Sequence, residues 1–170
     1  MLKKMIFVLS LFLVVFLYGE EKNPVIDGDV SPSEYQQKIE CGKGMELYIT
    51  ITGNKLFLAA KAKTTGWISI GLGSKVMDKA DLFIGYVKGG KSSFIRSIGV
   101  NHSHKIADST GVDSFVVKET GGYTYIEFSL DRGKFIKAGA VQFPVLVGYS
   151  KKDDFKSRHK FRKSLTVKIK

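Results

Sequence analysis

Short segments rich in β-branched and aromatic residues, separated by glycine-containing turns, are the feature that most constrains this chain. After residue 20 no segment has a sustained helical periodicity of apolar residues. Three β-hairpins are predicted: 45–52 with 55–62 around Gly53-Asn54, 81–88 with 92–100 around 89–91, and 114–120 with 123–130 around Gly121-Gly122. Segments 67–72, 141–150 and 164–169 bring the total to about nine strands. We therefore expect an all-β fold, an antiparallel immunoglobulin-like β-sandwich of about nine to eleven strands.

Alternation along the strands predicts which side chains form the core. In the segment 123–130, Ile126 and Phe128 share one face, which we expect to point inward, while Tyr125 and Glu127 point outward. The segments 81–88 and 141–147 are apolar on both faces instead. A strand of that kind must cover something on its outer face, namely another strand, a partner or an apolar ligand. Pro144, inside a predicted strand, indicates an edge or a bulge.

The first nineteen residues have the pattern of a secretory signal peptide. Two lysines precede the apolar run 5–17, which at 13 residues is shorter than the roughly 20 that a helix needs to span a bilayer. We expect residues 1–19 to be a signal peptide and residues 20–170 to form one domain. The protein is then exported to the periplasm or the extracellular space; an uncleaved run would instead tether it to the membrane.

The chain has a single cysteine, Cys41. One cysteine excludes an internal disulfide, a cysteine-based zinc site and a covalently attached c-type haem. We interpret Cys41 as a buried, inert thiol rather than as the donor of an intermolecular bond.

Two loop residues, Met77 and His159, are the candidates for chemistry. Taken alone, Met77 is typical of a methionine that packs over the core, and His159 is typical of a histidine on the solvated surface. Together they suggest haem, because a thioether and a neutral imidazole are an established pair of axial ligands that raises the reduction potential. His102 and His104 would share one face if they lay on a strand, but their surroundings indicate a turn, so we expect a polar loop there.

No motif of a hydrolase, a metalloprotease or a phosphate-binding loop occurs in the sequence, so we do not expect an enzyme. The formal net charge is +11, with many of the cations in the last twenty residues. Nucleic acid is disfavoured as a partner because an exported protein rarely meets it. These cations form a solvated face, neutralise haem propionates or steer an acidic redox partner.

Four blocks of the sequence resemble the DOMON family across nearly the whole predicted domain. The first is 25–35, with Ile26-Asp27-Gly28; the second joins 66–72, Met77 and 80–87. The third is 123–129, and the fourth runs from 153–159 to Arg162 and 164–167. The resemblance implies an exported β-sandwich that binds haem b or a sugar. In the cytochrome branch of the family a methionine of the second block and a histidine of the fourth hold the iron, which here implies Met77 and His159.

The resulting hypothesis is an exported b-type cytochrome-like domain that transfers single electrons and binds haem b without a covalent bond. The expected cofactor-binding residues are Met77, His159, Trp67, Phe83 and Arg162, with apolar walls around Trp67, Phe83 and Ile84. Its partner would be an unidentified redox protein or membrane electron carrier, and the chain a monomer or weak oligomer. The alternative is a non-enzymatic carbohydrate-binding module with Trp67, Tyr86, Tyr123 and Tyr125 as platforms for sugar rings; a structural, adhesin-like domain is the third possibility.

Overall fold

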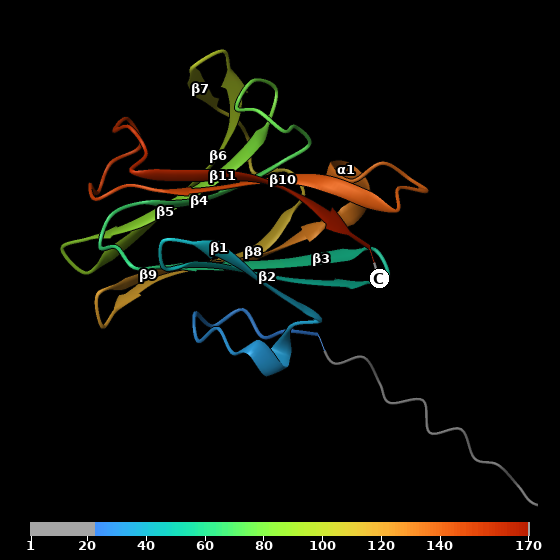
Figure 1. The fold of residues 1–170 in the computed structure, drawn as a ribbon, viewed down its shortest axis with the longest axis horizontal. Helices are drawn as coiled ribbons and strands as arrows, with labels where there is room; N and C mark the ends of the chain where they lie inside the picture. Colours follow the sequence, from blue (N-terminus) through green and yellow to red (C-terminus); the bar gives the residue numbers. More distant parts are fainter. Residues whose placement is uncertain (1–22, 170) are drawn as a thin grey trace, which may run out of the picture.

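The computed structural model of this chain describes residues 23–169. The predicted signal peptide, residues 1–19, lies outside the described residues. Two antiparallel sheets face each other in a sandwich (Figure 1). The five-stranded sheet has the order β1-β2-β3-β9-β8, and the six-stranded sheet has the order β11-β10-β4-β5-β6-β7. The expected all-β sandwich is confirmed.

The eleven strands of the described part are joined by tight turns and two short helical segments. The strands are β1 (Gln37–Gly42), β2 (Met45–Thr52), β3 (Lys55–Ala62), β4 (Ile68–Leu72), β5 (Asp81–Lys88), β6 (Lys91–Val100), β7 (Ser103–Ile106), β8 (Val112–Thr120), β9 (Tyr123–Asp131), β10 (Gln142–Tyr149) and β11 (Phe161–Lys168). The helical segments are η1 (Pro32–Glu34) and α1 (Arg132–Phe135). The three predicted hairpins are present, and Gly53 takes the positive φ of 55° that its turn requires. Within residues 23–169, no helix is long and apolar enough to cross a membrane.

The strands β1 and β7 were not among the nine segments predicted from the sequence. Each is a short strand at the edge of a sheet, and each carries few large apolar residues. Natural sheets keep their edges short and polar to avoid pairing with other chains, so edge strands give a weak sequence signal. Pro144 lies one residue beyond the last β10–β4 pair, so at that position β10 pairs only with β11, as at an edge.

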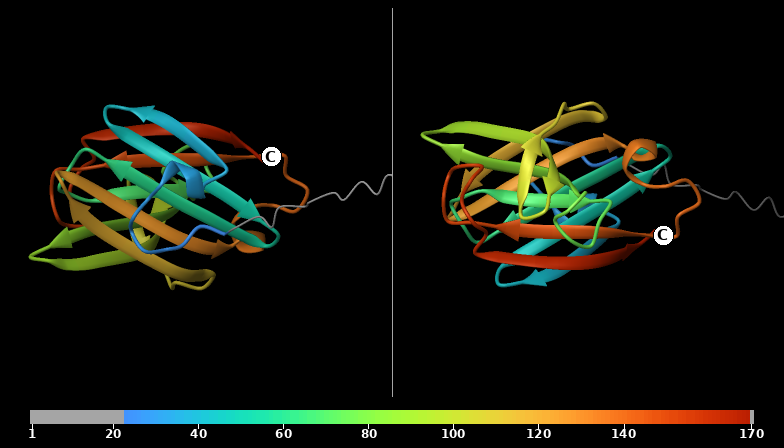
Figure 2. Two further views of the ribbon diagram at one scale, coloured as in Figure 1. Left: turned by 90° about the horizontal axis from the view of Figure 1, so that it is seen from below. Right: turned by 90° about the horizontal axis from the view of Figure 1, so that it is seen from above.

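The two sheets lie one over the other (Figure 2), and apolar side chains of both form one core between them. Ile126 and Phe128 point into this core, as alternation along β9 predicts, and both are completely buried. Phe83 of β5 lies there too, with its ring centre 4.7 Å from that of Phe128. Aromatic rings from the two sheets therefore hold the layers together at this point.

The segment 25–35 covers the outer face of the five-stranded sheet around Glu127. Glu127 does point outward, but it is completely buried. Its carboxylate accepts hydrogen bonds from the hydroxyl of Tyr35 and from the backbone N–H groups of Gly28, at 2.7 Å, and Asp27, at 3.0 Å. Burial raises the pKa of Glu127 above its usual range. The outer face of the six-stranded sheet carries a groove instead.

Candidate binding groove on the six-stranded sheet

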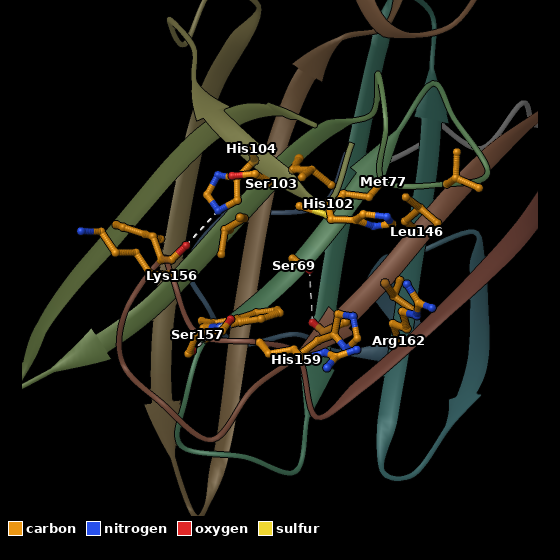
Figure 3. Close-up of a pocket in the computed structure, with 18 of the residues that line it drawn as sticks. Ser69, Met77, His102, Ser103, His104, Leu146, Lys156, Ser157, His159 and Arg162 are labelled. Carbon is orange, nitrogen blue, oxygen red and sulfur yellow. Dashed lines mark hydrogen bonds between the residues drawn. The ribbon is translucent and has the colours of Figure 1, made fainter. Parts of the chain in front are cut away.

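A groove with a volume of about 1200 Å³ lies on the outer face of the six-stranded sheet (Figure 3). Its floor is formed by β4, β5, β10 and β11, and its walls by residues 75–77, by the turn and strand 102–106, and by the loop 155–159. Sites for drug-sized ligands usually measure about 300–1,000 Å³, so this groove has room for a large ligand.

The floor is apolar because β5 exposes large side chains on its outer face as well. Leu82 and Ile84 point into the groove and are buried with Trp67 in a separate cluster. Phe83, between them in the sequence, points to the other side and is fully buried in the core between the sheets. The expectation that Phe83 forms a wall of the site is therefore corrected: alternation along the strand gives that role to its two neighbours.

Small residues leave space for a ligand above the middle of the groove floor. Ser69 of β4 is paired with Gly148 of β10, and both line the groove. A Cβ atom on Gly148 would lie 3.1 Å from the carbonyl oxygen of Phe161 and 3.5 Å from the hydroxyl of Ser69. A larger side chain at position 148 would therefore fill space that the groove needs.

Met77 is held at one wall by a close contact between its loop and β6. The N–H of Lys79 donates to the carbonyl of Gly99, and the N–H of Gly99 donates to the carbonyl of Ala80, both at 2.9 Å. A Cβ on Gly99 would lie 1.7 Å from the carbonyl oxygen of Met77. Only glycine allows this approach, which leaves the Met77 side chain half-buried on the groove wall.

The loop that carries His159 is fastened from below by Trp67. The indole N–H of Trp67 donates to the hydroxyl of Ser157 at 2.9 Å and to its carbonyl at 3.2 Å. The backbone of Trp67 also exchanges hydrogen bonds with Lys152 and Ser150, at 3.0 and 2.9 Å. The buried indole thus fixes the loop, and with it His159, at the wall facing Met77 (Figure 3).

His159 is half-buried and surrounded by cations. Burial, followed by the positive charges of Arg162 and Arg158, lowers the pKa of the imidazole below its usual value. A neutral imidazole keeps a lone pair on one ring nitrogen, which is the form that binds a metal ion.

The polar lining of the groove is strongly basic. Four arginine or lysine residues of the last twenty line it, Lys156, Arg158, Arg162 and Lys163, together with Lys75. No aspartate or glutamate lies among the lining residues. The groove therefore favours a ligand that combines a large apolar surface with negatively charged groups.

His102 and His104 both line this groove, although the sequence pattern indicated only a polar turn. The turn ends at His102, and His104 lies on β7. One ring nitrogen of His104, Nε2, is 2.8 Å from the carbonyl oxygen of Phe155 on the opposite wall, while its Nδ1 is buried without a partner. The spacing of two residues was the one sequence signal that could have placed both histidines on a common face.

The aromatic residues considered as sugar platforms do not form one surface. Trp67 is buried, with 8% of its surface exposed, and Tyr86 packs against Phe155 with ring centres 4.7 Å apart. Tyr123 and Tyr125 belong to the other sheet, where the ammonium of Lys61 lies 4.6 and 5.5 Å from their ring centres. The four aromatic residues are therefore divided between the two sheets and do not form one platform for a sugar ring.

The residues of the groove fit a haem. A thioether and a neutral imidazole stand at facing walls, the floor between them is apolar, and cations are available for two carboxylates. No cluster of three or more His, Cys, Asp or Glu residues that could hold a metal ion by itself occurs in residues 23–169. This donor set matches a metal held by a macrocycle and two axial side chains better than a protein-only metal site.

Cys41 lies away from the groove, in the core between the sheets, with 2% of its surface exposed. Burial raises the pKa of its thiol to about 11. This environment agrees with the interpretation of an inert thiol.

No known sequence family and no curated protein matches the chain. Solved structures do match its fold. The cytochrome b domain of pyranose dehydrogenase from Coprinopsis cinerea is 12% identical, with a TM-score of 0.59 over 74% of this chain and 77% of that one. The cytochrome domain of cellobiose dehydrogenase from Myriococcum thermophilum is 7% identical, with a TM-score of 0.58 over 79% of this chain and 81% of that one. The chain therefore has the same fold as these two domains, and the β-sandwich expected from the sequence is confirmed.

Proposed function

We propose that this protein binds haem b without a covalent bond and transfers single electrons, with Met77 and His159 as the axial ligands. The observation that carries the proposal is the placement of a thioether and a neutral imidazole at facing walls of one large groove with an apolar floor. The fold shared with two cytochrome domains supports the same conclusion. A bound haem would supply an iron that accepts and releases one electron.

The chain's own residues hold, shield and tune such a group. Leu82, Ile84 and Trp67 keep water from the groove floor, and exclusion of water is one of the factors that set a redox potential. Arg158 and Arg162 supply positive charge for carboxylates at the mouth of the groove. Burial and the positive charge of Arg162 lower the pKa of His159, which favours the neutral imidazole with a lone pair available as a ligand.

Met77 and His159 would both hold the iron of a bound haem, and such a group would supply electron transfer, so we propose electron transfer rather than catalysis. The electrons would pass to a separate redox protein or membrane carrier. An exported location rests on the signal-peptide prediction for residues 1–19, and a domain of residues 20–170 accommodates all strands of the described part.

Absorption spectroscopy of protein produced with a haem supply tests the proposal. We expect a Soret band and a low-spin spectrum in the reduced form. His159→Ala should abolish the low-spin spectrum, and Met77→Ala should remove the thioether-to-iron charge-transfer band of the oxidised form. Met45→Leu is the matched control, since Met45 is completely buried in the core, away from the groove. A colourless protein, or a spectrum that neither ligand variant changes, would contradict the proposal.

A further inference from the structure

A second imidazole stands on the wall that carries Met77. His102 lies at the turn between β6 and β7, and it lines the same groove as Met77 (Figure 3). The backbone N–H of Asn101 donates to the carboxylate of Asp78 at 2.8 Å, which ties this turn to the residue after Met77. The Gly99 contact fastens the same two segments a few residues earlier. His102 and Met77 therefore belong to one connected wall, opposite His159.

The two histidines of this hairpin differ in how free their rings are. His104 is engaged with the carbonyl of Phe155, so a new bond at its Nε2 would require breaking that contact across the groove. His102 is exposed, and its imidazole forms no hydrogen bond with any residue in the range 23–169. Its imidazole can therefore turn toward the groove without disrupting the packing around it.

We propose that His102 is a reserve ligand that takes the axial position of Met77 whenever the thioether leaves the iron. This inference rests on the proposed function, because it requires haem in the groove. In the exchange the iron–sulfur bond breaks and a bond from iron to an imidazole nitrogen of His102 forms. No electron is transferred, and the proton on the other ring nitrogen stays in place.

The exchange has a chemical rationale. A thioether is a soft ligand that is lost when a peroxide transfers one oxygen atom to the methionine sulfur, which becomes a sulfoxide while the peroxide is reduced to water or an alcohol. An imidazole is not lost in this way, and it suits iron. Met77 is only half-buried, so this loss is accessible to it. With His102 bound, side chains would occupy both ligand positions of the iron, so molecular oxygen could not bind to it. The potential falls, because methionine is the ligand that raises it.

Variants at Met77 test the inference. We expect Met77→Ala protein with bound haem to remain low-spin, to show a reduction potential lower than the wild type, and to bind carbon monoxide slowly. The double variant Met77→Ala/His102→Ala should become high-spin and bind carbon monoxide at once. Met77→Ala/His104→Ala is the matched control, since it removes the neighbouring groove histidine, and it should stay low-spin.

The outcomes separate this inference from the proposed function. Wild-type protein that binds no haem would overturn both. Wild-type protein with a Met/His spectrum, together with a high-spin Met77→Ala variant, would overturn the reserve ligand alone. Should Met77→Ala fail to fold, Met77→Leu preserves the side-chain volume and serves the same comparison; loss of haem from folded Met77→Leu protein would also count against His102.

Discussion

The contact between Gly99 and Met77 leads to a prediction that needs no cofactor. In Gly99→Ala the new Cβ would begin 1.7 Å from the carbonyl oxygen of Met77, whereas real Cβ contacts essentially never fall below 3.0 Å. The two backbone segments must therefore separate by about 1.3 Å, the difference between these two distances. Such a shift breaks the two hydrogen bonds of 2.9 Å that join Gly99 to Lys79 and Ala80.

The structure sets the size of the effect. Each hydrogen bond contributes about 1 kcal/mol net, and more if the freed groups stay buried, so the free energy of unfolding should fall by about 2–4 kcal/mol. For a domain of this size, a loss of about 2 kcal/mol lowers the melting temperature by roughly 4–8 °C. The Met77 thioether moves with its loop, so haem-bound Gly99→Ala protein should also lose the thioether signature.

Urea unfolding of the cofactor-free protein, followed by the fluorescence of the single tryptophan, measures the change. Gly133→Ala is the matched control, because Gly133 lies outside the positive-φ region and a Cβ there meets its nearest atoms at 3.5 Å. We expect this control to stay within about 0.5 kcal/mol of the wild type. If Gly99→Ala and Gly133→Ala unfold at the same urea concentration, the close approach of the two segments does not exist and the placement of Met77 is wrong.

Three further predictions concern other parts of the molecule. Trp67→Phe removes the indole N–H that bonds Ser157, so stability should fall by about 1 kcal/mol and bound haem should transfer faster to an acceptor protein; an unchanged transfer rate would argue against this anchor. Burial raises the pKa of Glu127, so the folded protein holds this proton more tightly than the unfolded chain. The stabilisation that the Glu127 proton gives to the folded protein is complete below the pKa in the unfolded chain, about 4.3, and is lost as the pH rises through the pKa in the folded protein. In urea titrations between pH 4 and 8, Glu127→Gln should remove this dependence of the free energy of unfolding on pH. The Cys41 thiol, with its pKa raised to about 11, should react with a thiol reagent at pH 8 only after unfolding, and rapid labelling of the folded protein would contradict its burial.

The sequence predicts which residues of a strand share a face, but it does not always predict which of the two faces points into the core. On β9 only one face is uniformly apolar, so Ile126 and Phe128 were assigned to the core correctly. On β5 both faces are apolar, and nothing local decides whether Phe83 or its neighbours look into the core. In the structure Phe83 points into the core, whereas Leu82 and Ile84 point into the groove. Which face of β5 turns inward depends on how its sheet packs on the other sheet, and that packing involves segments far away in the sequence.

Glu127 illustrates a second limit. Its outward direction follows from the period of two along β9, but its burial depends on the segment 25–35, which is distant in the sequence. A pattern confined to one strand contains no information about what covers that strand.

The sequence by itself determined the hairpins, the sandwich and the resemblance that singled out Met77 and His159, because turn chemistry and side-chain alternation act over a few residues. Only the tertiary structure decided that both residues line one groove, that Trp67 and Gly99 hold their loops in place, and that His102 stands beside Met77. These are contacts between segments far apart along the chain, and they arise when strands pair and sheets pack rather than from any local preference.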